Sequence, residues 1–176
     1  MKSVIQFRLS AFILIATLLL AGCAHYQLGT GGKLAFTTLY VEPVGTKVLL
    51  PQAQALVSTQ LRSALNRDGR VTLVNSPEAA DATLKVVLAD FRREVAAQRT
   101  GTTGDSGLAR KFTLTLGATA TLTDNRAHRA LFTDRPVSAH RDTFTDGGQI
   151  QSEYQSLPLL ADALADKLTH AVLDVW

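Results

Sequence analysis

The stretch that decides the fold runs from Phe112 to Thr123 and reads Phe-Thr-Leu-Thr-Leu-Gly-Ala-Thr-Ala-Thr-Leu-Thr. Apolar residues alternate with threonine or glycine at every position, which is the spacing of a β-strand whose two faces differ. The apolar face needs a covering layer. The threonine face is either the water-exposed side of a sheet or a surface that lies against a partner.

Further strands are predicted on both sides of this segment. β-branched and aromatic content or period-two alternation marks them at residues 34–41, 71–74, 82–95 and 129–143. A tight turn at Asp124-Asn125-Arg126 joins the central strand to the last one. Pro136 cannot donate a ladder hydrogen bond, so the last strand should lie at a sheet edge or be interrupted there.

Two amphipathic helices complete the pattern. The first, from Pro51 to Asn66, has apolar residues at three- and four-residue spacing, and its proline suits a first turn. The second is predicted over residues 156–175, with Ser156 as its N-terminal cap and Pro158 in its first turn. Both helices carry an apolar stripe that can cover a sheet.

The order β-α-β-β-β-β-α predicts an α+β fold. We expect a two-layer sandwich in which both helices cover one face of a mostly antiparallel or mixed β-sheet. The hairpins favour antiparallel pairing, whereas the first β-α-β unit needs a parallel, right-handed crossover. Residues 34–176 are enough chain for a single α/β sandwich domain with its own core.

The N-terminus has the pattern of an export signal. Lys2 and Arg8 precede the apolar run Phe12–Leu20, which is too short to span a membrane comfortably. The run ends in Leu-Ala-Gly-Cys, residues 20–23, which resembles the lipobox of bacterial lipoproteins. That resemblance implies a signal peptide at residues 1–22, cleavage before Cys23, a diacylglycerol on its thiol and a lipidated tether over residues 23–33. The alternative is an ordinary secretory signal followed by an incidental cysteine.

The cysteine and charge content limit the classes of function that the chain can have. Cys23 is the only cysteine, so no internal disulfide is available, and acylation would explain an otherwise free exported thiol. Lys2 and Arg8 belong to the segment expected to be removed, which leaves basic and acidic residues nearly balanced. There is no block of Lys and Arg interleaved with aromatic residues, so we expect no nucleic-acid partner.

Motifs for catalysis are missing from the sequence. The four histidines, at positions 25, 128, 140 and 170, do not have metal-ligand spacing. The chain has no Gly-x-Ser-x-Gly elbow, no His-Glu-x-x-His sequence and no phosphate-binding Gly-Lys-Ser/Thr loop. We therefore expect no enzyme activity, no bound metal and no cofactor.

One long connection carries a candidate binding site. Residues 97–109 join two strong strands, although a simple hairpin needs only two to five linking residues. Basic residues gather in and beside this segment: Arg92, Arg93, Arg99, Arg110 and Lys111. The segment is either an ordinary solvated loop or a basic tip that binds phosphate or an acidic partner through charge-assisted hydrogen bonds.

Several short motifs follow the lipobox in a fixed order. They are Tyr26-Gln27-Leu28-Gly29, a strand ending at Val41-Glu42-Pro43, a helix with Gln60-Leu61-Arg62, the strand entry Ala79-Ala80-Asp81-Ala82-Thr83-Leu84, and Asp124 at the end of the central strand. In this arrangement the chain resembles the lipopolysaccharide-assembly lipoproteins, the LptE-like family. The resemblance extends over nearly the whole mature chain.

That resemblance implies a function and a set of partners. A member of the family would be anchored by its lipid to the periplasmic side of the outer membrane. It would plug the lumen of an LptD-type β-barrel, help the barrel to assemble and help deliver lipopolysaccharide to the outer leaflet. Residue 24 is Ala and not the Asp that usually marks inner-membrane retention in Gram-negative lipoproteins, so the lipobox resemblance implies the inner leaflet of the outer membrane. The alternative is a different non-catalytic outer-membrane lipoprotein, an adaptor in secretion or envelope maintenance.

The resemblance also implies where lipopolysaccharide binds. Family members contact it through basic residues near the ends of the sheet. By position, this role falls to Arg99, Arg110 and Lys111. A second family contact, in the loop before the last helix, has no clear basic counterpart beyond Arg141.

Overall fold

The computed structural model of the chain describes residues 34–97, 111–144 and 149–174. All of them belong to the unit Leu34–Trp176. The segments predicted to be signal peptide and tether, and with them Cys23, lie outside the described residues, as does most of the long basic connection. The proposed domain boundaries therefore stay predictions.

The elements follow the predicted order, with additions. They are β1 (Thr38–Val41), β2 (Gly45–Thr46), α2 (Pro51–Asp68), β3 (Thr72–Val74), a 3-10 turn (Pro77–Ala79), β4 (Ala82–Ala97), β5 (Lys111–Asp124), β6 (Arg129–Phe144) and α3 (Gln149–Leu173). The first strand begins later than predicted, and the two-residue strand β2 was not predicted at all. Everything else that the sequence marked as a strand or helix is present.

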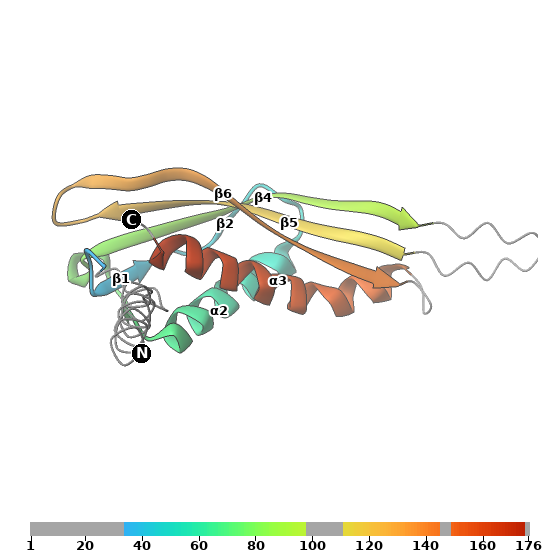
Figure 1. Cartoon of the computed structure of the whole chain (residues 1–176), viewed down its shortest axis with the longest axis horizontal. Coiled ribbons are helices and arrows are strands. Elements are labelled where there is room, and N and C mark those ends of the chain that lie inside the picture. The colour runs from blue at the N-terminus through green and yellow to red at the C-terminus, as the bar shows by residue number, and fades with distance from the viewer. Residues whose placement is uncertain (1–33, 98–110, 145–148, 175–176) are drawn as a thin grey trace, which may run out of the picture. The chain divides into compact units, whose positions relative to one another are not determined.

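The strands form one mixed sheet covered on one side. The sheet order is β3-β1-β4-β5-β6, and β2 pairs with β4 off this path. β1 runs parallel to β3 and β4, whereas β4, β5 and β6 pair antiparallel. Figure 1 shows α2 and α3 side by side beneath the same face of the sheet. The predicted α+β two-layer sandwich is confirmed.

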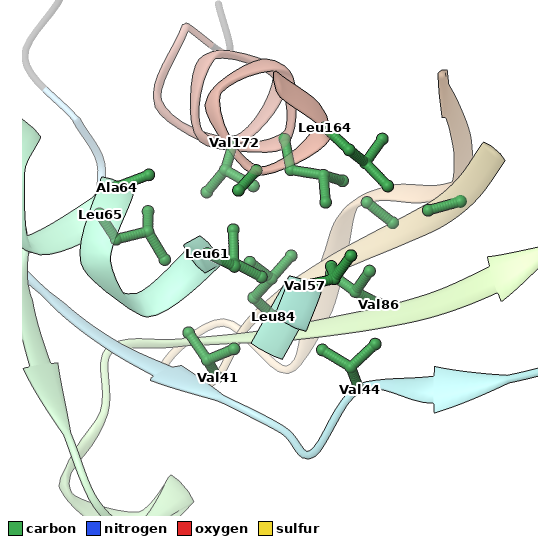
Figure 2. Close-up of a cluster of buried hydrophobic side chains, with 14 of the residues drawn as sticks. Val41, Val44, Val57, Leu61, Ala64, Leu65, Leu84, Val86, Leu164 and Val172 are labelled. Atoms are coloured by element: carbon green, nitrogen blue, oxygen red, sulfur yellow. The ribbon is translucent and has the colours of Figure 1, made fainter. Parts of the chain in front are cut away.

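The core lies between the helices and the apolar face of the long strands. Leu114, Leu116 and Leu122 of β5 are fully buried, and the threonines between them are half-buried. Figure 2 shows Val57 and Leu61 of α2 among side chains from the sheet and from α3. The alternation of β5 therefore decides which face of the sheet the helices cover.

The last helix differs from its prediction. α3 starts at Gln149, so Pro158 lies inside the helix instead of in its first turn. Ser156 is not a cap: its side chain is buried, and its hydroxyl donates to Thr143 Oγ1 of β6 at 2.9 Å. Proline inside a helix costs about 3 kcal/mol. The burial of apolar side chains next to Pro158, such as Leu157 and Leu160, offsets that cost.

β6 lies at the edge of the sheet, where a strand that contains a proline is expected. β6 is the last strand in the sheet order, and Pro136 pairs with Thr119 in the register. An edge strand tolerates proline because one side of its backbone has no ladder to complete. The expectation of an edge strand at Pro136 is confirmed.

Candidate functional site

The sheet face opposite the helices is an uncovered polar surface, which we call the open face. It carries Thr113, Thr115, Thr119, Thr121 and Thr123 of β5, flanked in register by residues of β4 and β6. Within the ranges that the structure describes, both helices lie on the other side of the sheet. The open face is therefore available to a partner.

Two ion pairs lie on the open face. Arg92 Nε lies 2.8 Å from Asp90 Oδ2, and Lys111 Nζ lies 2.6 Å from Asp142 Oδ2. Asp142 also accepts a hydrogen bond from the Thr113 hydroxyl at 2.7 Å. Lys111 and then Thr113 lower the pKa of the Asp142 carboxyl. The surface is thus polar, and two of its cations, Arg92 and Lys111, are held by neighbouring acids, whereas Lys85 is exposed on the same face.

A β-bulge in β4 reverses which residues of that strand face the helices. Leu88 pairs with Ala118 of β5 and Asp90 pairs with Gly117, which leaves Ala89 as the extra residue. The Asp90 carboxylate lies over Gly117, where a Cβ would meet Asp90 Oδ1 at 1.9 Å. Beyond the bulge, Arg92 lies on the open face and Arg93 points to the helix layer, where it pairs with Glu153 of α3.

Asp81 ties the start of β4 to the start of β1. Its Oδ2 accepts hydrogen bonds from the Thr37 N–H at 2.9 Å, the Thr37 hydroxyl at 2.9 Å and the Thr38 N–H at 3.1 Å. Arg126 Nη2 lies 2.5 Å from the other oxygen. The two backbone donors, Thr37 first, hold the pKa of the Asp81 carboxyl well below its usual range.

Asn125 anchors the β5–β6 turn to the same place. Its side-chain amide donates to the carbonyls of Pro77 and Ala80 at 3.1 and 2.9 Å, and to the Thr83 hydroxyl at 3.0 Å. Its N–H donates to the Asp81 carbonyl at 2.8 Å. A shallow concavity of about 540 Å³ lies over these groups. Because their polar atoms already have partners, the arrangement is one that fixes the fold.

A family comparison covers most of the folded unit. The model of the family described as "LptE: Lipopolysaccharide-assembly" matches residues 36–172. The chain belongs to the LptE family. Its role therefore lies in lipopolysaccharide assembly. The match runs from the loop before β1 nearly to the end of α3, so it includes the open face and the Asp81 and Asn125 contacts.

Solved structures share the fold at low sequence identity. A hypothetical protein from Chlamydia trachomatis superposes with a TM-score of 0.53 at 11% identity, covering 80% of this chain and 98% of that chain. A protein from Xanthomonas campestris gives 0.52 at 12% identity, covering 80% and 85%. A homolog of neuraminyllactose-binding hemagglutinin from Helicobacter pylori gives 0.50 at 10% identity, covering 84% and 92%. A search of curated proteins finds no match.

The structure describes only part of the predicted binding set in this LptE-family chain. Lys111 is the first residue of β5, and its ammonium is held by Asp142. Arg99, Arg110 and Cys23 lie outside the described residues. Arg141 is exposed on β6. It lies in the same register row as Arg93 of β4, with Leu114 of β5 between them. Lipopolysaccharide binding by Arg99, Arg110 and Lys111 stays a prediction.

The described residues hold neither a metal cluster nor a membrane-spanning helix. Across residues 34–97, 111–144 and 149–174, no three His, Cys, Asp or Glu side chains gather as a metal site would require. In the same ranges no helix is both long and apolar enough to cross a membrane.

We expect Asp81→Asn to weaken the acid dependence of stability. The folded-state pKa of Asp81 lies below the ordinary value of 3.8, so its contribution is present above that pH and is lost as the pH falls below it. The variant should unfold at a lower temperature at neutral pH and lose less stability than the native chain on acidification below about pH 4. Thermal unfolding followed by circular dichroism across this range measures both effects.

The matched control is Glu78→Gln, which removes an exposed carboxylate from the 3-10 turn before β4. It should leave the acid dependence as in the native chain. If Asp81→Asn and Glu78→Gln behave alike, the Asp81 contacts do not hold β1 to β4 in solution.

Proposed function

We propose that this chain is a non-catalytic outer-membrane lipoprotein that plugs an LptD-type β-barrel. In this role it helps the barrel to assemble and helps deliver lipopolysaccharide to the outer leaflet. The observation that carries the proposal is the family match over residues 36–172. The lipid on Cys23 would hold the folded unit at the periplasmic side of the outer membrane.

The open face supports this role on physical grounds. The lumen of an outer-membrane transport barrel is lined by polar side chains. A threonine-rich sheet whose Arg92 and Lys111 already have acidic partners can pack against such a wall without leaving those two charges unpaired. The helix layer on the other side already uses its apolar stripe to form the core. We therefore place the principal barrel contact on the open face.

Thr119→Trp is expected to disrupt the barrel contact. Thr119 lies at the middle of β5, between Val87 of β4 and Pro136 of β6. A tryptophan there would hold a closely packed partner away from the sheet, while aromatic residues are well tolerated in strands. The amount of LptD-type barrel that co-purifies with the tagged full-length chain should fall about tenfold or more.

Ser63→Trp provides the control. Ser63 is exposed on α2, in the helix layer, and its replacement by tryptophan enlarges the side chain by a similar amount. It should leave the yield of barrel unchanged. Loss of the barrel in Ser63→Trp, with full recovery in Thr119→Trp, would place the contact on the helices and contradict the open-face assignment.

Charge reversal tests the predicted lipopolysaccharide contact. The triple variant Arg99→Glu, Arg110→Glu and Lys111→Glu should weaken binding of purified lipopolysaccharide about tenfold or more, because phosphates pair strongly with clustered Arg and Lys. Part of the Lys111 effect would come from its Asp142 partner, which would then face a second carboxylate. Surface-immobilised lipopolysaccharide provides the binding measurement.

An equal change of net charge elsewhere serves as the comparison. Lys47, Lys85 and Arg129 are exposed cations of the described chain, and their combined replacement by Glu changes the charge by the same amount. Binding should survive in that variant. Equal weakening in both triple variants would mean that net charge, and not this cluster, attracts lipopolysaccharide.

A further inference from the structure

The edge strand β6 has one side without a partner strand. β5 pairs with the other side, and successive residues of β6 direct their backbone groups alternately toward β5 and away from it. The Leu88 carbonyl bonds to the segment on the far side of β4, so Val87 beside it exchanges its bonds with Thr119 of β5. Ala118 therefore exchanges its bonds with Val137 of β6. From Val137 onward, every second residue of β6 bonds to β5, and the residues between them face outward.

This alternation identifies the outward residues of β6. They are Pro136, Ser138, His140, Asp142 and Phe144. A contact from α3 agrees with the assignment, because Lys167 Nζ donates to the Ser138 carbonyl at 2.8 Å. Pro136 agrees as well, because it has no N–H and leaves no ladder bond unmade at an outward position.

Residues 138–144, which we call the β6 edge, are open to another strand. In the part of the chain that the structure describes, no backbone group bonds to the outward N–H groups of Ser138, His140 or Asp142. Pro136 ends this row of donors, because proline has no N–H. A row of unpaired backbone N–H and C=O groups is a template for a strand of another chain.

Cations line the helix side of the β6 edge. Arg141 is exposed and takes a helix-facing position in register with Leu114, whose side chain is buried. Arg135 and Lys167 lie beside the same edge, where they donate to backbone carbonyls. None of these three cations forms an ion pair with an acid in the described ranges. A strand added here would meet positive charge without a carboxylate beside it.

We propose that an extended, acidic segment of a partner protein adds to the sheet as a strand along the β6 edge. Its backbone groups pair with the outward groups of β6, and carboxylates at alternate positions face Arg141 and the neighbouring cations. The side chains between them continue the open face, where Phe144 leaves 56% of its surface exposed and offers an apolar contact. Opposite charges in cross-strand pairs stabilise a sheet, so the charge of the β6 edge selects the partner.

Two other occupants fit the β6 edge less well. A second copy, paired through its own β6 edge, would bring the cations Arg135, Arg141 and Lys167 of both chains to one seam, and like charges across strands are destabilising. Lipid phosphates would pair with the cations but would leave the row of backbone groups without a partner strand. An acidic peptide satisfies both features together.

The proposal does not depend on the plug role. Peptide binding is measured with the purified full-length chain in detergent, free of any barrel, whereas recovery of the barrel tests the plug role. Each can therefore fail without the other.

The experiment selects short random peptides displayed on phage for binding to that purified chain. Enriched peptides are synthesised, and their affinity is measured by fluorescence polarisation. We expect Asp or Glu at alternate positions of the enriched peptides. Two versions of a selected peptide, each methylated at one set of alternate backbone amides, should differ about tenfold or more in affinity, because only one set faces β6. This comparison needs no change in the protein.

Variants of the protein locate the site. His140→Pro removes an outward N–H at the kind of position that Pro136 already occupies, so β6 keeps its bonds to β5. It should weaken peptide binding about tenfold or more, whereas His140→Ala keeps the N–H and should stay within about twofold. Arg141→Glu should weaken binding about fivefold or more, and Arg129→Glu, the same charge change at the other end of β6, should not.

Each of three results would overturn the proposal. The first is a selection that enriches no peptide, or only peptides without acidic residues. The second is equal affinity of the two methylated peptides. The third is equal peptide affinity of Arg141→Glu and Arg129→Glu. Loss of binding to purified lipopolysaccharide in Arg141→Glu, together with a selection that enriches no peptide, would assign the cations to lipid phosphates instead.

Discussion

Replacing Cys23 by serine is expected to abolish all incorporation of labelled fatty acid into the protein. Cys23 ends the lipobox-like sequence and is the only cysteine in the chain, so no other thiol can accept the lipid. Each buried CH₂ of an acyl chain contributes about 0.8 kcal/mol to membrane binding, and stable anchoring takes more than one chain. Metabolic labelling with a fatty-acid analogue, followed by purification of the tagged chain, measures the loss.

Fractionation of the cells provides the control. Residues 24–176 exported behind a cleavable signal peptide without a lipobox should appear with the soluble periplasmic proteins, while the native chain stays with the membranes. Cys23→Ser is unsuitable for this comparison because its leader would remain attached. A Cys23→Ser variant that still carries labelled fatty acid would contradict lipidation at Cys23.

The second large effect concerns the core. Leu61 of α2 is fully buried and lies among side chains of the sheet and of α3, as Figure 2 shows. Leu61→Ala should lower the free energy of unfolding by about 2–5 kcal/mol, because it removes buried methyl groups and leaves a cavity. That is a large fraction of the stability of a domain of this size. Chemical denaturation of the folded unit provides the measurement.

Thr59→Ala is the matched control on the same helix. Thr59 is exposed, and its hydroxyl makes a local hydrogen bond to the Ala55 carbonyl at 3.0 Å. Its replacement should change the free energy of unfolding by no more than about 0.5 kcal/mol. A loss of less than about 1 kcal/mol in Leu61→Ala would mean that α2 does not pack on the sheet as described.

The fold could be predicted from the sequence where apolar and polar residues alternate regularly. The threonine alternation of Phe112–Thr123 predicted β5, its covered face and the antiparallel hairpins, and Pro136 predicted the edge position of β6. Strand β2 has two residues, too few to show any period. The early start of α3 was missed because Pro158 suggested a first turn, and local propensity gave way to packing against the sheet.

The site was predictable only in part. Lys111 was named from its charge, but its pairing with Asp142 depends on the register of β5 and β6. Asp81 belongs to one of the short family motifs, but the sequence does not show what its carboxylate binds. Its donors, Thr37 and Thr38, are more than 40 residues away along the chain. Arg92 and Arg93 point to opposite faces, as neighbours in any strand do, but which of them faces the helices depends on the bulge at Ala89, which the alternation of Leu84, Val86 and Leu88 does not predict.

The proposed plug role requires this chain to lie inside an LptD-type barrel. The most direct test is the identity of the protein that co-purifies with the native, tagged, full-length chain from detergent-solubilised membranes. We expect an LptD-type barrel in equimolar amount. Recovery of the lipoprotein without any barrel, or with another envelope protein in its place, would contradict the plug role and favour an adaptor.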